Sequence, residues 1–258
     1  MKLLAATILV AGLTCFAERC GFESPPPEVM LKMKTELDNH DRIFMDHNDT
    51  YTIDTYIHVE VMNDAYAPAG FKFVLKSVDL LIDNALYTVE KWSKGEEGFQ
   101  KALHKGTYGD LNLYLINALE GASGEIDGHC SLPNGLDLIY TETILDGCVF
   151  VVGSLPGGKD TNYNHGMTAV HETGHWLGLL HTFQGGCDGP GDGVNDTPAQ
   201  FVPTKGCPKT NPNTCPDRPG LDPIHNYMNY ASDQCMTEFT PGQIKRMRSA
   251  YDLYRRGR

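Results

Sequence analysis

Three histidines and one glutamate lie close together in the stretch HETGHWLGLLH. On a helix, residues four apart face the same side, so His171 and His175 can present their imidazoles to one metal ion. Gly178 can adopt a left-handed conformation that ends the helix, which lets His181 return as a third ligand. Glu172 lies beside the first of these ligands. The spacing is typical of a zinc site whose fourth position stays open.

The chemistry of such a site is hydrolysis. A zinc ion held by three protein nitrogens binds water in its open position and lowers the pKa of that water. The Glu172 carboxylate can act as general base on zinc-bound water and then as general acid toward a leaving amine. The pattern therefore predicts cleavage of peptide bonds with one catalytic zinc ion. The alternative is a helix with half-buried histidines and a solvated glutamate, which Gly178 and His181 disfavour.

The composition and the first residues indicate where the protein works. The chain has 258 residues, and its formal net charge is −12. This charge disfavours nucleic acid and anionic membranes as partners, because both attract basic patches. Residues 1–17 combine Lys2, an apolar run and small residues before a cut after Ala17, which is typical of a secretory signal peptide. We expect an extracellular monomer that acts on proteins or peptides.

The hydrophobic pattern predicts the elements that position the histidines. Residues 51–61 alternate apolar and polar side chains and predict a half-buried strand, while residues 71–92 carry an apolar helical face. Residues 111–119 and 149–152 predict further strands. This order indicates a mixed α/β layer in which helices pack on a sheet.

The composition of the chain changes after His181. Residues 182–226 are rich in Gly, Pro, Asp, Asn and Cys and show little periodicity, so we expect a functional or cross-linked stretch. A helix then closes the chain. Thr240 can cap it, Pro241 suits its first position, and Gln243 completes a capping box.

The histidine motif and four further stretches resemble known zinc endopeptidases. The extended motif matches that of the metzincin clan, and NYMNY matches the clan's methionine turn with Met228 at the turn. Tyr230 matches a tyrosine that in some metzincins contacts the zinc or the transition state. HTFQGGC, VNDTPAQ, NYMNY and CMTEFTPGQIKRM resemble the pappalysin family, especially its secreted fungal and microbial members.

The resemblance runs from about Tyr51 to the C-terminus and implies an α/β (α+β) metzincin-like zincin. It implies an N-terminal lobe, residues 51–178, with a twisted mixed sheet and the active-site helix. A smaller, irregular, disulfide-linked C-terminal lobe, residues 179–258, ends in a helix. Residues 18–50 are then a candidate pro-segment. The substrate would lie extended between the lobes and pair with an edge strand, for which we expect residues 111–119.

Secretion makes the eight cysteines informative, because an oxidising compartment favours disulfides. Spacing alone permits three pairings of the four cysteines in the irregular lobe. The pairs that the resemblance favours there are Cys187–Cys215 and Cys207–Cys235. Cys130 and Cys148 flank a short excursion between strands and are expected to pair with each other.

Cys20 remains once Cys15 leaves with the signal peptide. Arg19-Cys20-Gly21 resembles the cysteine-switch core of some metzincin pro-segments, in which a thiolate occupies the open position on zinc. We therefore predict that Cys20 is a zinc latch. The alternatives are an inert thiol and an intermolecular disulfide.

Three smaller predictions concern metal, sugar and specificity. The stretch CDGPGDGVNDTP is rich in oxygen ligands but has no EF-hand spacing, so a solvated loop is an alternative to a calcium site. The ligands that the resemblance implies for calcium are Asp192, Asp196 and Thr197. Asn48 begins a glycosylation sequon. In metzincins the specificity pocket is walled by the segment after the methionine turn, where Asp233 would favour a basic side chain if it points inward and Gln234 would replace it otherwise.

Two other classes of function are alternatives to an endopeptidase. A non-catalytic binding protein with a structural zinc ion usually supplies four protein ligands, often cysteines. An exopeptidase or amidase needs a clamp for a free peptide terminus, and the sequence shows no obvious one. Both alternatives fit the sequence less well than an endopeptidase does.

Overall fold

The structure is a computed structural model. The residues that it describes are 18–20, 31–32, 34–37, 51–55, 60–79, 81, 86–133 and 143–258. The predicted signal peptide and the glycosylation candidate Asn48 lie outside these residues. Within them, no helix has the length and apolar character needed to cross a membrane.

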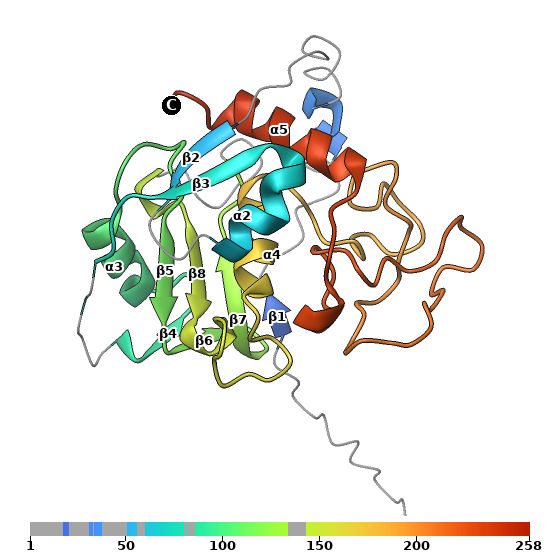
Figure 1. The fold of residues 1–258 in the computed structure, drawn as a ribbon, viewed down its shortest axis with the longest axis horizontal. Helices are drawn as coiled ribbons and strands as arrows, with labels where there is room; N and C mark the ends of the chain where they lie inside the picture. The colour runs from blue at the N-terminus through green and yellow to red at the C-terminus, as the bar shows by residue number, and fades with distance from the viewer. Residues whose placement is uncertain are drawn as a thin grey trace, which may run out of the picture.

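A mixed sheet forms the larger part of the fold (Figure 1). Its strands run in the order β4–β6–β7–β8–β5, and β1 pairs with β7 in addition. The strands are β1 Glu18–Cys20, β4 Thr88–Glu90, β5 Leu113–Ile116, β6 Ala118–Gly121, β7 Gly124–Cys130 and β8 Cys148–Val151. Strand β7 is antiparallel to β6 and β8 but parallel to β1. A second, two-stranded parallel sheet joins β2 Tyr51–Thr55 to β3 Phe71–Leu75.

The helices pack around these strands. They are α2 Glu60–Tyr66, α3 Lys94–Leu103, α4 Met167–Trp176 and α5 Pro241–Tyr254. Single 3-10 turns cover Ala67–Ala69, Thr143–Leu145, Val152–Ser154 and Asp233–Cys235. Helix α4 packs on β7 and β8 and also contacts α2. In Figure 1 the loops after α4 extend away from the larger sheet, and α5 runs back across one end of the molecule. The mixed α+β architecture that the sequence predicts is therefore present.

The prediction of one helix over residues 71–92 is wrong. Phe71 and Phe73 are buried while Lys72 between them is exposed, which is the period of a strand. Such a short apolar run does not distinguish a helix from a strand by itself, and pairing with β2 decides for the strand. The other strand predictions hold with shorter bounds. The predicted strand 51–61 ends at Thr55 and is followed by α2, and 111–119 divides into β5 and β6.

One hydrophobic core extends across the position at which α4 ends. Tyr66 and Phe71 from the N-terminal part share a buried cluster with Met228 and Met247 from the C-terminal part. Residues 182–226 form turns and bends without a helix or strand. The structure contains all three expected disulfides, Cys130–Cys148, Cys187–Cys215 and Cys207–Cys235. The irregular part is thus held by cross-links and by its share of a common core.

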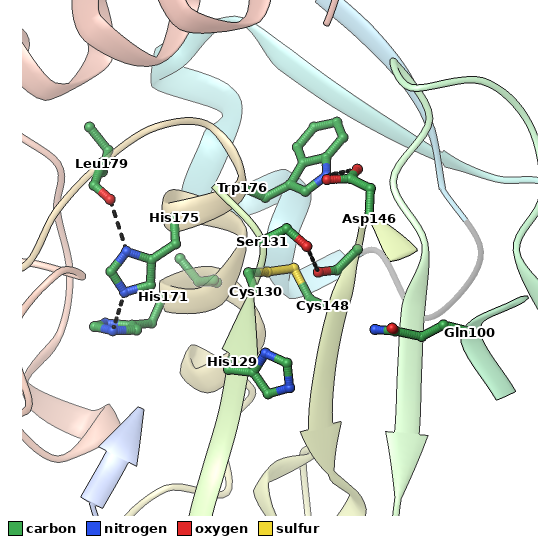
Figure 2. The surroundings of a disulfide bond; sticks show 12 residues. Gln100, His129, Cys130, Ser131, Asp146, Cys148, His171, His175, Trp176 and Leu179 are labelled. Atoms are coloured by element: carbon green, nitrogen blue, oxygen red, sulfur yellow. Dashed lines mark hydrogen bonds between the residues drawn. A yellow bond between two sulfur atoms is a disulfide. The ribbon is translucent and has the colours of Figure 1, made fainter. Parts of the chain in front are cut away.

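Two polar arrangements fix the ends of α5. At its start, Thr240 and Gln243 form the expected capping box. Beyond its end, Arg255 Nη1 donates to Asp146 Oδ2 at 2.8 Å, and Trp176 Nε1 donates to the same oxygen at 2.7 Å. The Arg255 guanidinium also lies 3.7 Å from the centre of the Trp176 ring. Figure 2 shows the contact between indole and carboxylate beside the Cys130–Cys148 disulfide. These bonds tie the end of α4 to the end of α5.

Candidate active site

The three histidines of the motif converge on one point. Helix α4 carries His171 and His175 and ends at Trp176, and Gly178 follows with a φ of 88°. This left-handed residue turns the chain so that His181 returns to the helix. The Nε2 atoms lie 3.2 Å apart for His171 and His175, 3.1 Å for His175 and His181, and 3.2 Å for His171 and His181. Because Gly178 lets the chain turn after α4, His181 can complete the cluster.

Hydrogen bonds orient two of these rings. His171 Nδ1 donates to the Tyr227 carbonyl at 2.7 Å, and His175 Nδ1 donates to the Leu179 carbonyl at 2.8 Å. The contact between His175 and Leu179 is drawn in Figure 2. Bonds of this kind fix the tautomer and leave the Nε2 lone pair for a metal. Both rings are thus held with their ligand atoms toward the centre of the cluster.

The electrostatics of the cluster fit a zinc ion. Burial lowers the pKa of all three histidines, that of His175 to about 3, so the rings are neutral near pH 7. Three neutral rings that bring lone pairs within hydrogen-bond distance of one another repel unless a cation lies between them. Tetrahedral zinc with Zn–N bonds of about 2.05 Å separates its nitrogens by about 3.3 Å, close to the spacing observed here.

Glu172 lies next to the cluster in a tightly packed place. Its side chain is completely buried, and burial raises its pKa to about 8, while the Cys20 thiol and the Arg19 guanidinium act in the opposite direction. A Cβ atom on Gly128 of β7 would lie 3.1 Å from Glu172 Cγ. The absence of a side chain at Gly128 therefore leaves room for the glutamate, a role that sequence reasoning did not find.

The methionine turn packs against the helix that carries the cluster. Met228 is fully buried, and a side chain at Gly174 would collide with its sulfur atom. The residue before it, Tyr227, supplies the carbonyl that orients His171. Gly174 thus permits the methionine turn to lie directly against α4. The same turn positions His171 through the Tyr227 carbonyl.

Aromatic rings border the cluster on another side. Tyr230 lies with its ring centre 4.9 Å from that of His181 and 5.6 Å from that of His171. Phe183 stacks on His181 at 4.7 Å with an interplanar angle of 11°. Sequence reasoning identified Tyr230 but missed Phe183, although an aromatic residue two positions after the third histidine was a usable signal.

The N-terminal strand β1 covers the site. It pairs in parallel with β7, which brings Cys20 opposite Gly128. The Cys20 sulfur and the three histidine ligand atoms all lie within 4.8 Å of one another. The Cys20 carbonyl accepts a hydrogen bond from the Tyr230 hydroxyl at 3.1 Å. Cys20 is therefore a neighbour of the cluster, as the latch hypothesis requires.

The Arg19 side chain is buried beside the cluster. Its Nη2 lies 2.8 Å from Asp233 Oδ1, its Nη1 donates to the Ala231 carbonyl at 2.6 Å, and its guanidinium lies 4.8 Å from the centre of the Tyr163 ring. The Arg19 and Asp233 side chains are 2% and 1% exposed. Gln234 is exposed. Of the two residues considered for the specificity pocket, Asp233 is the one that points inward. The ion pair of Arg19 with Asp233 is not predicted by the sequence.

The strand expected to pair with the substrate is not one of those that lie against α4. Strand β5, within residues 111–119, pairs with β8 and lies two positions from β7 in the sheet. Strand β7 contacts α4 and carries Gly128, and its pairing with β1 places Cys20 opposite Gly128, beside the cluster. The position of β7 beside the site could not be predicted from the order of the strands, because β7 follows β6 in an antiparallel pair that the residue pattern does not indicate.

The residues expected to bind calcium lie near the start of α5. Asp192 is buried, and its Oδ1 accepts from the Val194 backbone at 2.9 Å. Asp192 Oδ2 and Thr197 Oγ1 are buried without a hydrogen bond of normal geometry. Both carboxylate oxygens of Asp196 accept bonds from α5, from Thr240 Oγ1 and from the Gly242 backbone. Burial raises the pKa of Asp192 to about 7.

Comparison with known proteins supports the interpretation of the cluster. Residues 100–252 match the Peptidase_M43 family model, described as pregnancy-associated plasma protein-A. An extracellular metalloprotease of Pyricularia oryzae is 46% identical over 231 residues, which cover 80% of this chain and 77% of that protein. Extracellular metalloprotease NCU07200 of Neurospora crassa is 48% identical over 210 residues, covering 81% of this chain and 70% of that protein. Extracellular metalloprotease 1 of Coccidioides posadasii is 38% identical over 281 aligned positions, covering 100% and 98%.

Solved structures share the fold. Promirolysin of Tannerella forsythia superimposes with a TM-score of 0.64 at 22% identity and covers 92% of this chain and 94% of that chain. Mature mirolysin in complex with a cleaved peptide superimposes with a TM-score of 0.53 at 22% identity, covering 90% and 88%. At such identities the likeness concerns the arrangement of the chain.

Proposed function

The chain belongs to the Peptidase_M43 family and is an extracellular metalloprotease, and we propose that it hydrolyses internal peptide bonds at the cluster of His171, His175 and His181. The observation that carries this proposal is the convergence of three Nε2 atoms, 3.1–3.2 Å apart, beside the buried Glu172. The C-terminal Tyr230 and the N-terminal Cys20 complete the surroundings of the cluster.

In this proposal the three imidazoles hold one zinc ion. When bound, the ion supplies Lewis-acid chemistry, because it acidifies water and polarises a carbonyl group. Glu172 takes a proton from the attacking water and returns it to the amine that leaves. The Tyr230 hydroxyl, which donates to the Cys20 carbonyl, is placed to donate to the carbonyl oxygen of a peptide in the position of β1.

The substrate lies extended along β7, in a cleft between residues 51–178 and residues 179–258. The pairing of β1 with β7 supports this, since it shows that an extended segment fits beside the cluster. The buried ion pair of Arg19 with Asp233 supports a preference for a basic side chain. Such a side chain would form the charged pair with Asp233 that Arg19 forms now.

Residues 18–50 act as a pro-segment whose Cys20 closes the site. The thiol is close enough to the histidine ligand atoms to compete for the open position on zinc. While β1 lies along β7, it also occupies the place in which the substrate would bind. Removal of the segment would therefore free the metal position and the cleft together.

A structural calcium ion is proposed at Asp192, Asp196 and Thr197. The buried Asp192 Oδ2 and Thr197 Oγ1, neither with a normal hydrogen bond, are oxygen ligands of the kind that calcium takes. Calcium there would neutralise the buried Asp192 and join the loop to the start of α5 through Asp196.

The proposal is tested by Glu172→Ala, with Glu97→Ala as a control on α3, where Glu97 is half-buried and pairs with Lys94 and Lys101. The Glu172→Ala protein should retain one zinc ion per chain and lose peptide hydrolysis by a factor of at least about 100. Digestion of a protein mixture, followed by mass spectrometry of the fragments, measures both rate and cut positions. Retained hydrolysis in Glu172→Ala would overturn the role of Glu172, and release of single terminal residues would favour an exopeptidase.

A further inference from the structure

The N-terminal segment has a contact with the rest of the molecule that lies apart from β1. Residues 34–37 are helical and lie beside α5, whereas β1 lies beside β7 and α4 (Figure 1). Leu37 is only 3% exposed. It shares a buried cluster with four residues from later in the chain, namely Leu132, Leu180, Ala250 and Tyr254. We call these four residues the Leu37 seat.

Polar contacts flank this apolar one. The Tyr254 hydroxyl donates to Glu36 Oε2, and Lys34 Nζ donates to Asn195 Oδ1 at 3.3 Å. A hollow of about 260 Å³ beside them is lined by Lys34 and Leu37 together with residues 193–196 and with Gly242, Lys245 and Arg246 of α5. The short helix thus meets α5, the loop around Asn195 and the seat at the same time.

The seat is linked to the active site through its own residues. Leu180 immediately precedes the third histidine ligand, and Leu132 follows β7 by two residues. A segment bound at the seat therefore packs against Leu180, the residue before His181. Strand β1 lies beside the histidine cluster itself, so the N-terminal segment contacts the residues around His181 at two separate places.

We propose that the Leu37 seat is an interaction surface for this chain's own residues 31–37, and that it retains the N-terminal segment after the segment has been cut from the catalytic domain. The proposal rests on the proposed role of residues 18–50 as a pro-segment. Two contacts on one short peptide reinforce each other, because release of one leaves it at a high effective concentration near its site. The cut segment is consequently a bidentate inhibitor that acts in trans.

Residues 31–37 fit the seat better than a second copy or a substrate helix because three of their side chains are matched. Leu37 fills the apolar centre, Glu36 reaches the Tyr254 hydroxyl, and Lys34 reaches Asn195. Another occupant would have to displace these contacts. A substrate helix or a second copy that bound there would therefore compete with the cut segment.

The first experiment uses the uncut chain and needs no catalytic activity. Cys20 is 2% exposed, so its rate of alkylation by a soluble thiol reagent reports release of the N-terminal segment. Leu37→Ala should raise this rate about 10- to 100-fold, as expected for the loss of one buried leucine side chain. Leu31→Ala is the matched control, because Leu31 is 61% exposed, and it should change the rate less than about 2-fold.

Global unfolding is separated from local release by a second variant and a second measurement. Tyr254→Phe keeps the ring in the seat and removes only the hydroxyl that binds Glu36, so it should give a smaller rise in the alkylation rate. Melting temperatures show whether a faster rate reflects unfolding of the whole chain. An alkylation rate that is the same in Leu37→Ala and in the parent overturns the proposal.

The second experiment adds synthetic peptides to the enzyme after the N-terminal segment has been cut and washed away. A reduced peptide of residues 18–40 should inhibit, and its Leu37→Ala form should need about 10- to 100-fold higher concentration. The Leu31→Ala peptide should match the parent, and a peptide of residues 18–27 should be as weak as the Leu37→Ala form or weaker. Equal inhibition by the long and short peptides overturns the proposal.

The two experiments also distinguish this inference from the proposed function. A chain that cleaves no peptide would refute the proposed function, while the alkylation rates would still decide whether the seat holds the segment. A Cys20→Ser peptide that inhibits as strongly as the parent peptide would refute the zinc latch and leave the seat supported.

Discussion

Replacing Asp233 by asparagine should selectively impair cleavage next to basic side chains. The change keeps the size of the side chain and removes its charge. One carboxylate oxygen lies 2.8 Å from the Arg19 guanidinium, and the other accepts backbone bonds from His165 at 2.9 Å and from Met167 at 3.2 Å. An asparagine can satisfy the two backbone donors only by turning its own NH₂ group toward the guanidinium. A donor would then face a donor in a buried pocket.

The magnitude follows from this geometry. At an effective dielectric constant of about 20, two unit charges 2.8 Å apart attract by about 6 kcal/mol before desolvation is subtracted. Removing one partner of a buried, hydrogen-bonded charge pair costs about 2–5 kcal/mol. For a peptide whose arginine or lysine takes the place of Arg19, this corresponds to a fall of about 30- to 5,000-fold in kcat/KM. Peptides with an uncharged residue there should lose little.

The assay is digestion of a peptide library that contains matched peptides with arginine, lysine, leucine and glutamine at each position. Gln234→Ala is the control, because Gln234 is the exposed neighbour of Asp233. The ratio of kcat/KM for basic over uncharged peptides should collapse in Asp233→Asn and stay unchanged in Gln234→Ala. If Asp233→Asn lowers both classes of peptide equally, or neither, then the pocket that Arg19 fills is not the specificity pocket.

Three further predictions test other parts of the structure. Cys20→Ser should remove one of the contacts that hold β1 in the cleft, so the uncut variant should begin to cleave peptides after a shorter lag than the parent, measured in the first minutes after mixing; identical lag times in variant and parent would contradict the latch. Because burial raises the folded-state pKa of Asp192 to about 7 from 3.8, the folded state binds this proton more tightly than the unfolded state, and without calcium the free energy of unfolding should fall as pH rises from about 4 to 7. Urea unfolding with a chelator that spares zinc should show this fall in the parent and a flatter profile in Asp192→Asn, while added calcium should abolish it; equal slopes in the two proteins would count against the site. Gly174→Ala should cost about 1–3 kcal/mol by pushing on Met228, whereas Gly98→Ala, with open space around it, should not destabilise; an unchanged melting temperature in Gly174→Ala would show that the turn yields.

The convergence of the three histidines was the most predictable part of the site. His171, Glu172, His175, Gly178 and His181 form a local pattern, and helix geometry alone converts it into a cluster. The cap of α5 was predictable for the same reason, since Thr240 and Gln243 lie within one turn. Local spacing determines both features, so no knowledge of distant contacts was needed.

The parts that could not be predicted depend on residues far apart in the chain. Residues 71–75 pair as a strand because β2 lies beside them, and their own pattern leaves helix and strand open. Arg19 meets Asp233 across 214 positions, and nothing in either residue's neighbourhood indicates the partner. Asp233 could be nominated as a pocket residue from its place after the methionine turn, but its inward direction required the fold.

The pairing of Arg19 with Asp233 has a consequence for how this protein could change over generations or in the laboratory. The pocket that would select a substrate side chain is also the pocket that grips the N-terminal strand. A substitution that retunes the pocket for a different side chain would loosen that grip unless position 19 changed to match. On the proposed roles of Asp233 and of the N-terminal segment, selectivity and latency would be coupled, so an engineered change of residue 233 would need a matching change of residue 19.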